Sequence, residues 1–298
     1  MRFVRWRHHA ILRNIDGIDY LTKSIIMDHL APLLRQITLS AQSFFSGELC
    51  QLVSFDQTAG HVHILKSGKI SMTVHNGPPA VIDQPSVIFF PRTCQHRFIP
   101  LEGEDNQLLC AYIDLGAQIG SPLAMSLPEV MVLPMNVMSP IKPTLEMLFN
   151  EAFSEAFGRQ AAIDRLIEYF LIQILRHVIA TGHLQGGIFA ALSDARLKHA
   201  VGAMHDKPGH PWTLDALADI AGMSRARFAV NFRETVGTTP LDYLTDWRIS
   251  IAQNLLKQGR PIKSVAAAVG YQSQAALSRV FAKRVGTAPA LWLKQLET

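Results

Sequence analysis

The chain of 298 residues is long enough to form two domains with separate hydrophobic cores. No run of about 18 apolar residues occurs, which argues against a transmembrane helix and a membrane partner. Three cysteines, Cys50, Cys94 and Cys110, form neither an even set nor a paired spacing, which argues against a disulfide-stapled fold. We therefore expect a cytoplasmic protein.

Residues 1–26 show no sustained hydrophobic period and carry five basic and two acidic residues. We expect this segment to be an extension, with Met27 as the biological start. A disordered basic tail is the alternative interpretation.

Short β-rich runs follow, each bounded by Gly, Pro, Asn or Asp. The predicted strands are 49–55, 62–65, 70–74, 80–82, 87–90 and 108–113. Evenly spaced short strands are typical of a β-sandwich or a barrel.

Two pieces of this region, His63-Ile-Leu-Lys-Ser-Gly68 and Phe89-Phe-Pro-Arg-Thr-Cys-Gln-His-Arg97, resemble cupin-type sensor domains. The resemblance implies a cupin-like β-barrel over residues 27–135 that senses a small molecule or oxidative stress. It covers two short pieces only, so the fold and the sensing role are expectations.

Metal-binding cupins use a His-x-His pair, a later Glu and a third His. His61 and His63 form such a pair, but Gly68 follows too closely to leave room for the Glu, and Lys66 stands there instead. His63 and His96 could still converge, near Cys94, and bind a zinc ion. We predict cofactor-free binding of an effector by His63 and His96, with zinc as the alternative.

Cys94 lies two residues from His96. A neighbouring imidazolium would lower the pKa of this thiol and make it sensitive to oxidants. We predict instead that Cys94 is a buried, inert thiol, as are Cys50 and Cys110, with oxidant sensing by Cys94 as the alternative.

A helical segment is predicted over residues 140–181. Thr144 can cap a helix with apolar residues at three-and-four spacing, which Gly158 ends. A second helix, 163–179, carries a wide apolar stripe that includes Ile167 and Ile174. We expect this stripe to serve dimerisation, with packing inside the domain as the alternative, and residues 182–192 to form a linker.

The last hundred residues contain the same helix-turn-helix pattern twice, at 214–234 and 262–284. In the first copy a short alanine-rich helix ends at Gly222, and a second helix then buries Phe228 and Phe232. In the second copy Gly270, Leu277 and Phe281 occupy the equivalent positions. Two copies in register, joined by an apolar-striped helix at 241–256, favour DNA binding over an ordinary helical hairpin.

Residues 193–298 resemble the DNA-binding domain of AraC-type transcriptional regulators. The matching pieces include Trp212-Thr-Leu-Asp-Ala-Leu-Ala, Gly237-Thr-Thr-Pro, Val269-Gly-Tyr and Gly286-Thr-Ala-Pro. This region holds 14 Lys and Arg against 8 Asp and Glu, whereas residues 1–192 hold 14 against 16. The positive charge thus coincides with the repeat, as contact with phosphates requires.

The exposed face of each second helix provides the predicted DNA contacts. These are Arg225, Ala226, Arg227, Ala229, Val230 and Arg233 in the first copy, and Ser273, Gln274, Ala275, Ser278, Arg279 and Lys283 in the second. Relatives often carry an arginine where Val230 stands, so we expect weaker base readout by the first helix.

The sequence therefore predicts an α+β protein of two domains: a cupin-like β-barrel with a helical segment and an all-α double helix-turn-helix domain. Its predicted function is that of a sequence-specific transcriptional regulator, acting as a nucleoid-associated homodimer with promoter DNA and RNA polymerase. A metal-dependent cupin enzyme with a tethered DNA-binding domain is the alternative.

Overall fold

The computed structural model describes residues 30–36, 39–55, 59–103, 105–115, 122–181 and 186–296. The predictions for residues 1–26 and for Met27 lie outside these ranges, as does most of the glycine-rich part of the predicted linker.

Two antiparallel sheets form the N-terminal half. The first has the order β1 (Leu39–Glu48), β8 (Gln107–Leu115), β3 (Gly60–Ser67), β6 (Ser86–Phe90) and β9 (Met131–Pro134). The second has the order β2 (Val53–Phe55), β7 (His96–Pro100), β4 (Ile70–Val74) and β5 (Ala80–Ile82). The cupin-like, β-rich fold is confirmed, although the two sheets form an open sandwich and not the closed barrel that we predicted.

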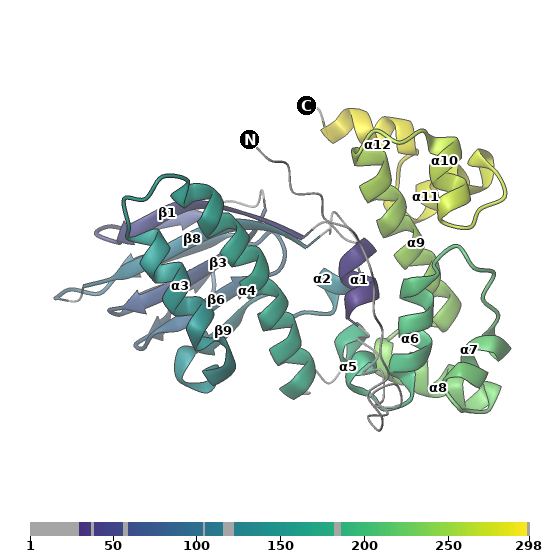
Figure 1. The fold of residues 1–298 in the computed structure, drawn as a ribbon, viewed down its shortest axis with the longest axis horizontal. Helices are drawn as coiled ribbons and strands as arrows, with labels where there is room; N and C mark the ends of the chain where they lie inside the picture. Colours follow the sequence, from purple (N-terminus) through teal and green to yellow (C-terminus); the bar gives the residue numbers. More distant parts are fainter. Residues whose placement is uncertain are drawn as a thin grey trace, which may run out of the picture.

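One apolar core fills the space between the two sheets. Phe90 and Leu108 enter it from the first sheet, and Met72 and Phe98 enter it from the second. Because side chains alternate along a strand, the other face of the first sheet must be covered separately. The helices α3 (Lys142–Ala152) and α4 (Arg159–Thr181) lie across that face (Figure 1).

The apolar stripe of α4 is part of a second intramolecular core, on this other face of the first sheet. Ile167 and Ile174 are fully buried, so they are not available to a second copy, and the prediction that the stripe serves dimerisation is wrong. The helix is fixed on β1 by the Asp164 carboxylate, which accepts hydrogen bonds from the Ser43 backbone N–H at 2.7 Å and the Ser43 hydroxyl at 2.9 Å.

The remaining helical elements before the C-terminal half are short. They are α1 (Ala31–Gln36), α2 (Pro122–Met125), two 3-10 turns (Met135–Val137 and Ser139–Ile141) and α5 (Gly187–Ser193). The last of these corrects the predicted linker, because α5 buries Ile188, Phe189 and Leu192 against its neighbours.

The C-terminal half is entirely helical over its described residues, as predicted. It contains α6 (Leu197–Asp206), α7 (Leu214–Ile220), α8 (Arg225–Val236), α9 (Pro240–Lys257), α10 (Ile262–Ala268), α11 (Gln274–Val285) and α12 (Pro289–Leu296). Among the described helices, none combines the length and the apolar character needed to cross a bilayer.

The two halves contact each other through several elements. The helix α1, although it precedes the first sheet in the chain, packs against α6, and Arg35 forms an ion pair with Asp206 at 3.5 Å (Figure 1). The helix α5 packs against α8, and Lys257 at the end of α9 lies 3.9 Å from Asp114 on β8. A change in the sheet domain can therefore reach the helical domain through packed elements.

Candidate functional site

Each helix-turn-helix unit is formed by local sequence signals. Thr213 and Ser224 cap α7 and α8, since their hydroxyls accept hydrogen bonds from the backbone N–H groups of Ala216 and Arg227. Phe228 and Phe232 are fully buried on one face of α8. The second unit repeats this arrangement, with Ser273 capping α11 and with Leu277 and Phe281 fully buried.

The long helix α9 joins the two units. Its Tyr243, Leu244 and Trp247 are buried, and it contacts both α8 and α11 (Figure 1). Because α9 spans 18 residues, it is about 27 Å long.

None of the predicted DNA-contacting residues is buried. Ala229 and Ser278 are partly exposed and the other ten are exposed, with Val230 at 56%. Two basic groups of this domain have acidic partners within it: Arg225 lies 3.4 Å from Asp215, and Arg284 lies 2.6 Å from Asp242. The Ser273 hydroxyl, predicted to contact DNA, also caps α11 by accepting from Ala276 N–H at 3.1 Å.

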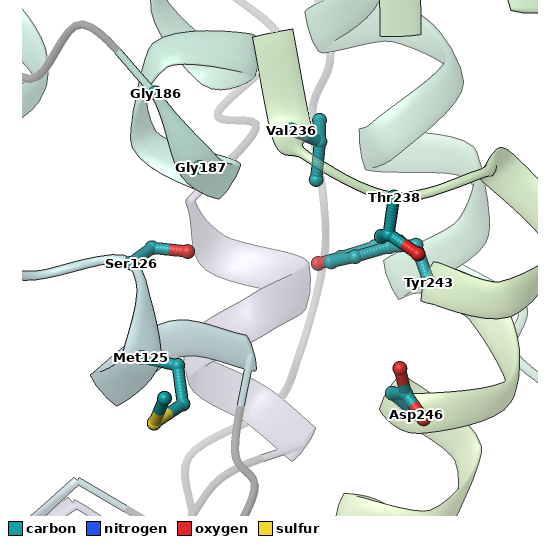
Figure 2. Close-up of a pocket in the computed structure, with 8 residues that line it drawn as sticks. All are labelled: Met125, Ser126, Gly186, Gly187, Val236, Thr238, Tyr243 and Asp246. Atoms are coloured by element: carbon teal, nitrogen blue, oxygen red, sulfur yellow. The ribbon is translucent and has the colours of Figure 1, made fainter. Parts of the chain in front are cut away.

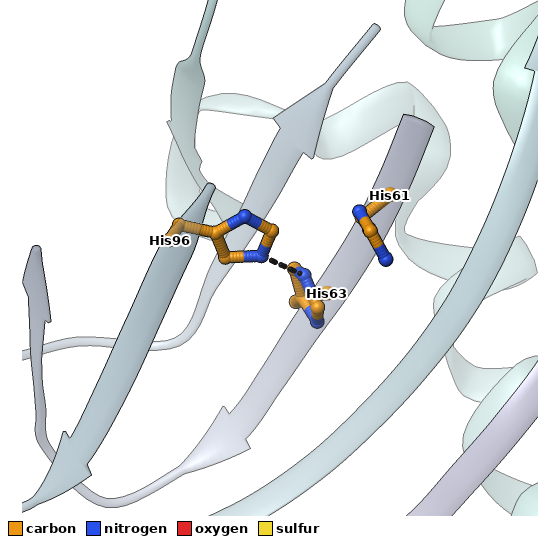
Figure 3. A group of neighbouring side chains, drawn as sticks. All are labelled: His61, His63 and His96. Carbon is orange, nitrogen blue, oxygen red and sulfur yellow. Dashed lines mark hydrogen bonds between the residues drawn. The ribbon is translucent and has the colours of Figure 1, made fainter. Parts of the chain in front are cut away.

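A buried cluster of three histidines lies between the two sheets. His61 and His63 point inward from β3, and His96 approaches them from β7 (Figure 3). One ring nitrogen from each lies within 4.8 Å of the others. The structure thus brings together the predicted pair His63 and His96, and it adds His61, which only the His-x-His spacing indicated.

Hydrogen bonds define the tautomers of two of these rings. His96 Nδ1 lies 2.8 Å from the Cys94 carbonyl oxygen, which can only accept, so His96 carries its proton on Nδ1. His63 Nε2, 2.8 Å from His96 Nε2, must then donate. This leaves a buried lone pair on His63 Nδ1 that no described protein group satisfies.

His63 and His96 are neutral at physiological pH. Burial, followed by the nearby His96 and His61, holds the pKa of His63 well below its usual range. Burial also lowers the pKa of His96 to about 4. Neutral imidazoles offer lone pairs to a metal ion, and the hydrogen bond from His96 Nδ1 to a carbonyl is the outer contact that orients a metal-binding histidine.

Cys94 does not have the properties predicted for a reactive thiol. Burial, together with the negative charge of Glu129, raises its pKa to about 11. The structure thus agrees with the predicted buried thiol and contradicts the lowered pKa of the alternative, while an oxidant-sensing role stays untested. Cys110 is buried as predicted, whereas Cys50 is exposed, because it follows the end of β1 instead of lying within a strand.

A pocket lies between the two halves of the molecule, separate from the histidine cluster. It encloses about 380 Å³ and is lined by residues of α5, α8 and α9 and of the segment around α2 (Figure 2). Two of its polar side chains have partners within the protein: Ser126 Oγ accepts from Ile188 N–H at 3.0 Å, and the Tyr243 hydroxyl is hydrogen-bonded to His205 Nε2 at 2.6 Å.

Comparisons with known proteins match both halves. A family model described as Cupin matches residues 28–180, and one described as a helix-turn-helix domain matches residues 217–295. An uncharacterized HTH-type transcriptional regulator of Haemophilus influenzae is 30% identical over 94% of this chain and 99% of that protein. The RCS-specific HTH-type transcriptional activator RclR of Escherichia coli is 30% identical over 76% of this chain and 81% of that protein.

Among solved structures, the DNA-binding domain of AdpA in complex with a target DNA is 30% identical to this chain. The match covers 33% of this chain and 90% of that domain, with a TM-score of 0.32.

Proposed function

Because the chain belongs to the AraC-type family of helix-turn-helix transcriptional regulators, in its cupin-bearing branch, we propose that its buried histidine cluster senses a signal that controls promoter binding. The protein is a DNA-binding regulator and not an enzyme, since the relatives named above are transcriptional regulators. One of them is named an activator, and we extend activation, with RNA polymerase as a partner, to this chain as part of the proposal.

The proposed DNA interface consists of the exposed faces of α8 and α11. Their separation along α9 suits two successive major grooves on one side of the duplex. In this arrangement Arg279 and Gln274 read base edges, because arginine pairs with guanine and glutamine with adenine. Arg225 and Arg227, at the start of α8, contact phosphates and set the register.

The observation that carries the sensing proposal is the convergence of three buried imidazoles. A tetrahedral zinc ion holds two nitrogen ligands about 3.3 Å apart, and His63 Nε2 and His96 Nε2 are 2.8 Å apart. A shift of the His63 proton from Nε2 to the unpartnered Nδ1, with a movement of about 0.5 Å, would therefore admit a divalent metal, with His61 as third ligand. The residues fit a zinc ion, which would supply a fixed positive charge that holds β3 and β7 together.

Binding of zinc can be tested on the full chain. We expect His63→Gln to lower zinc affinity by more than about tenfold, because it removes a ligand of the cluster. His177→Gln, on α4 and outside the cluster, is the matched control and should bind zinc as the wild type does. Isothermal titration of both variants measures this, and promoter binding with and without zinc shows whether the site regulates.

A wild-type chain that binds no zinc, or a His63→Gln chain that binds it equally well, would contradict the metal-binding proposal. A cofactor-free effector bound by His63 and His96 would then be the preferred signal. Association into a homodimer also stays a proposal, and sedimentation at micromolar concentration tests it.

A further inference from the structure

A second set of metal-binding side chains lies beside the histidine cluster. His75, Cys94 and Glu129 each offer one ligand atom within 4.8 Å of the other two. His75 Nε2 lies 2.9 Å from a Glu129 carboxylate oxygen and 3.8 Å from Cys94 Sγ. We propose that these three side chains form a second divalent-metal site, distinct from the histidine cluster and suited to zinc.

The distances agree with a tetrahedral ion. Zinc bonded to sulfur at about 2.3 Å and to nitrogen at about 2.0 Å holds these two atoms about 3.5 Å apart, near the 3.8 Å between Cys94 and His75. A nitrogen and an oxygen ligand are held about 3.3 Å apart, near the 2.9 Å between His75 and Glu129. Small side-chain movements in opposite directions would therefore complete the site.

The ligands come from three separate segments of the fold. His75 directly follows β4, Cys94 lies between β6 and β7, and Glu129 lies two residues before β9. The site would thus join the four-stranded sheet to the far edge of the five-stranded sheet. His75 is also the one non-glycine residue with positive φ among the described parts of the chain, at 51°, and its N–H donates to the Gln95 carbonyl at 2.7 Å.

The burial of the three ligands indicates an open site. The Cys94 side chain is fully buried, whereas those of His75 and Glu129 are 47% and 48% exposed. An ion could enter from the solvent side, and its fourth position would face water. Three protein ligands with one open position are typical of sites that bind a further ligand or exchange their metal, in contrast to closed structural sites.

Cys94 connects this site to the histidine cluster. Its Sγ belongs to the proposed site, while its carbonyl oxygen accepts the hydrogen bond that fixes the His96 tautomer. Movement of Cys94 toward an ion would therefore change the orientation of His96. The existence of the site does not depend on the histidine cluster binding metal, but this connection gives the site a route to the sensor core.

Cobalt titration of the full chain distinguishes the two sites, because only a thiolate ligand gives a sulfur-to-cobalt charge-transfer band. We expect the wild type to show this band, Cys94→Ser to lose it, and His75→Ala and Glu129→Gln each to weaken cobalt binding more than about tenfold. His75 and Glu129 are half-exposed, so these two variants should fold even if Cys94→Ser does not.

Two control variants distinguish this site from the exposed cysteine, Cys50, and from the histidine cluster. Cys50→Ser, at the exposed cysteine, should keep the band, and His63→Gln should keep it while losing the ion of the histidine cluster. A wild type without the band would overturn the proposal, as would a band that persists at unchanged affinity in both His75→Ala and Glu129→Gln. Loss of the band in Cys50→Ser would show that Cys50, and not Cys94, is the thiolate ligand, and would overturn the proposal.

Discussion

At the scale of single residues, the two DNA-reading helices differ in the chemistry that they expose. Arg279 and Gln274 on α11 can form hydrogen bonds to base edges, whereas Ala226 and Val230 on α8 can only make apolar contacts, for example with a thymine methyl group. The basic groups at the start of α8 contribute charge without reading sequence. The helix α11 should therefore provide most of the sequence specificity.

This difference predicts that two arginine substitutions lower DNA affinity in different ways, one depending on the DNA sequence and the other not. Arg279→Ala should cost about 1–3 kcal/mol on the cognate site and relax specificity at one base pair. Arg225→Ala should weaken binding to all sequences alike and reduce the salt dependence, because the proposed interface places Arg225 on a phosphate. Competition assays with base-substituted promoters measure both effects. A uniform loss of affinity in Arg279→Ala would refute base readout by this residue.

His205 predicts a pH dependence of stability. Burial lowers its pKa to about 3, and its Nε2 is bonded to the Tyr243 hydroxyl at 2.6 Å. The unfolded chain, with an ordinary pKa of about 6.5, then binds more protons than the folded chain below that pH. The stabilisation is therefore complete above about pH 6.5 and is lost as the pH falls, by about 2 kcal/mol at pH 5.

Urea unfolding followed by tryptophan fluorescence tests this at pH 7.5 and 5, since the Trp247 ring contacts His205. His205→Gln should lose about 2 kcal/mol less than the wild type between the two pH values. His199→Gln, on the same helix and partly exposed, is the control and should keep the wild-type loss. Equal losses in the wild type and in His205→Gln would show that another group titrates.

At the scale of elements, the two copies of the repeat differ in how their turns pack. Gly222 and Gly270 occupy equivalent positions, and both have left-handed φ, 62° and 83°. A Cβ on Gly222 would meet nothing within 4 Å, whereas one on Gly270 would lie 2.5 Å from the Gly209 carbonyl oxygen. The second turn therefore packs against backbone that cannot easily move.

Alanine at these two positions should have unequal effects. Gly222→Ala should cost about 1–2 kcal/mol from the left-handed conformation alone. Gly270→Ala should cost about 1–3 kcal/mol more, because the backbone of Gly209 must also shift. Urea unfolding of the two variants measures the difference, and equal losses would contradict the close approach of Gly209.

Elements with a clear local signal were predictable from the sequence. The predicted runs 70–74 and 80–82 agree with β4 and β5, and the predicted helix 163–179 lies within α4. The strands β1, β7 and β9 were missed, since Ser, Gln and Gly interrupt β1, since the polar His96 and Arg97 begin β7 and since Pro134 ends β9. Their pairing depends on partners far along the chain, such as Leu39 with Leu115.

The same contrast between local and long-range signals explains which residues of the candidate sites were predictable. His63 and His96 were predicted from the resemblance to cupin-type domains, because the relevant spacings are local. His75 and Glu129 were missed, since they are separated by 54 residues and only the folded sheets bring them together. The role of the α4 stripe was predicted wrongly, because hydrophobic periodicity does not distinguish an intramolecular partner from a second copy.

At the scale of the whole molecule, the boundary between the two halves is a packed interface. The helix α5 contacts α8 on one side and α2 and α4 on the other, and α1 covers part of α6. The pocket of about 380 Å³ lies in this interface (Figure 2). Changes in the cupin-like domain can thus alter the position of α8 without direct contact between the sheets and DNA.

This interface predicts which C-terminal fragment is independently stable. Ile188 and Phe189 of α5 are at most 1% exposed, and α5 packs against α8, so a fragment that begins after α5 loses part of its core. We expect residues 186–298 to fold and to shift promoter DNA at low salt without effector. Residues 194–298 should be less stable by at least about 2 kcal/mol, the contribution of one fully buried Phe or Ile.

Urea unfolding of the two fragments measures this difference, and three of the four tryptophans report on it because they lie beyond residue 194. Equal stability of the fragments would assign α5 to the sensor domain. An unfolded 186–298 fragment would instead show that the DNA-binding half needs α1, which packs on α6 in the intact chain. In that case the sensor would regulate the folding of the DNA-binding domain as well as its orientation.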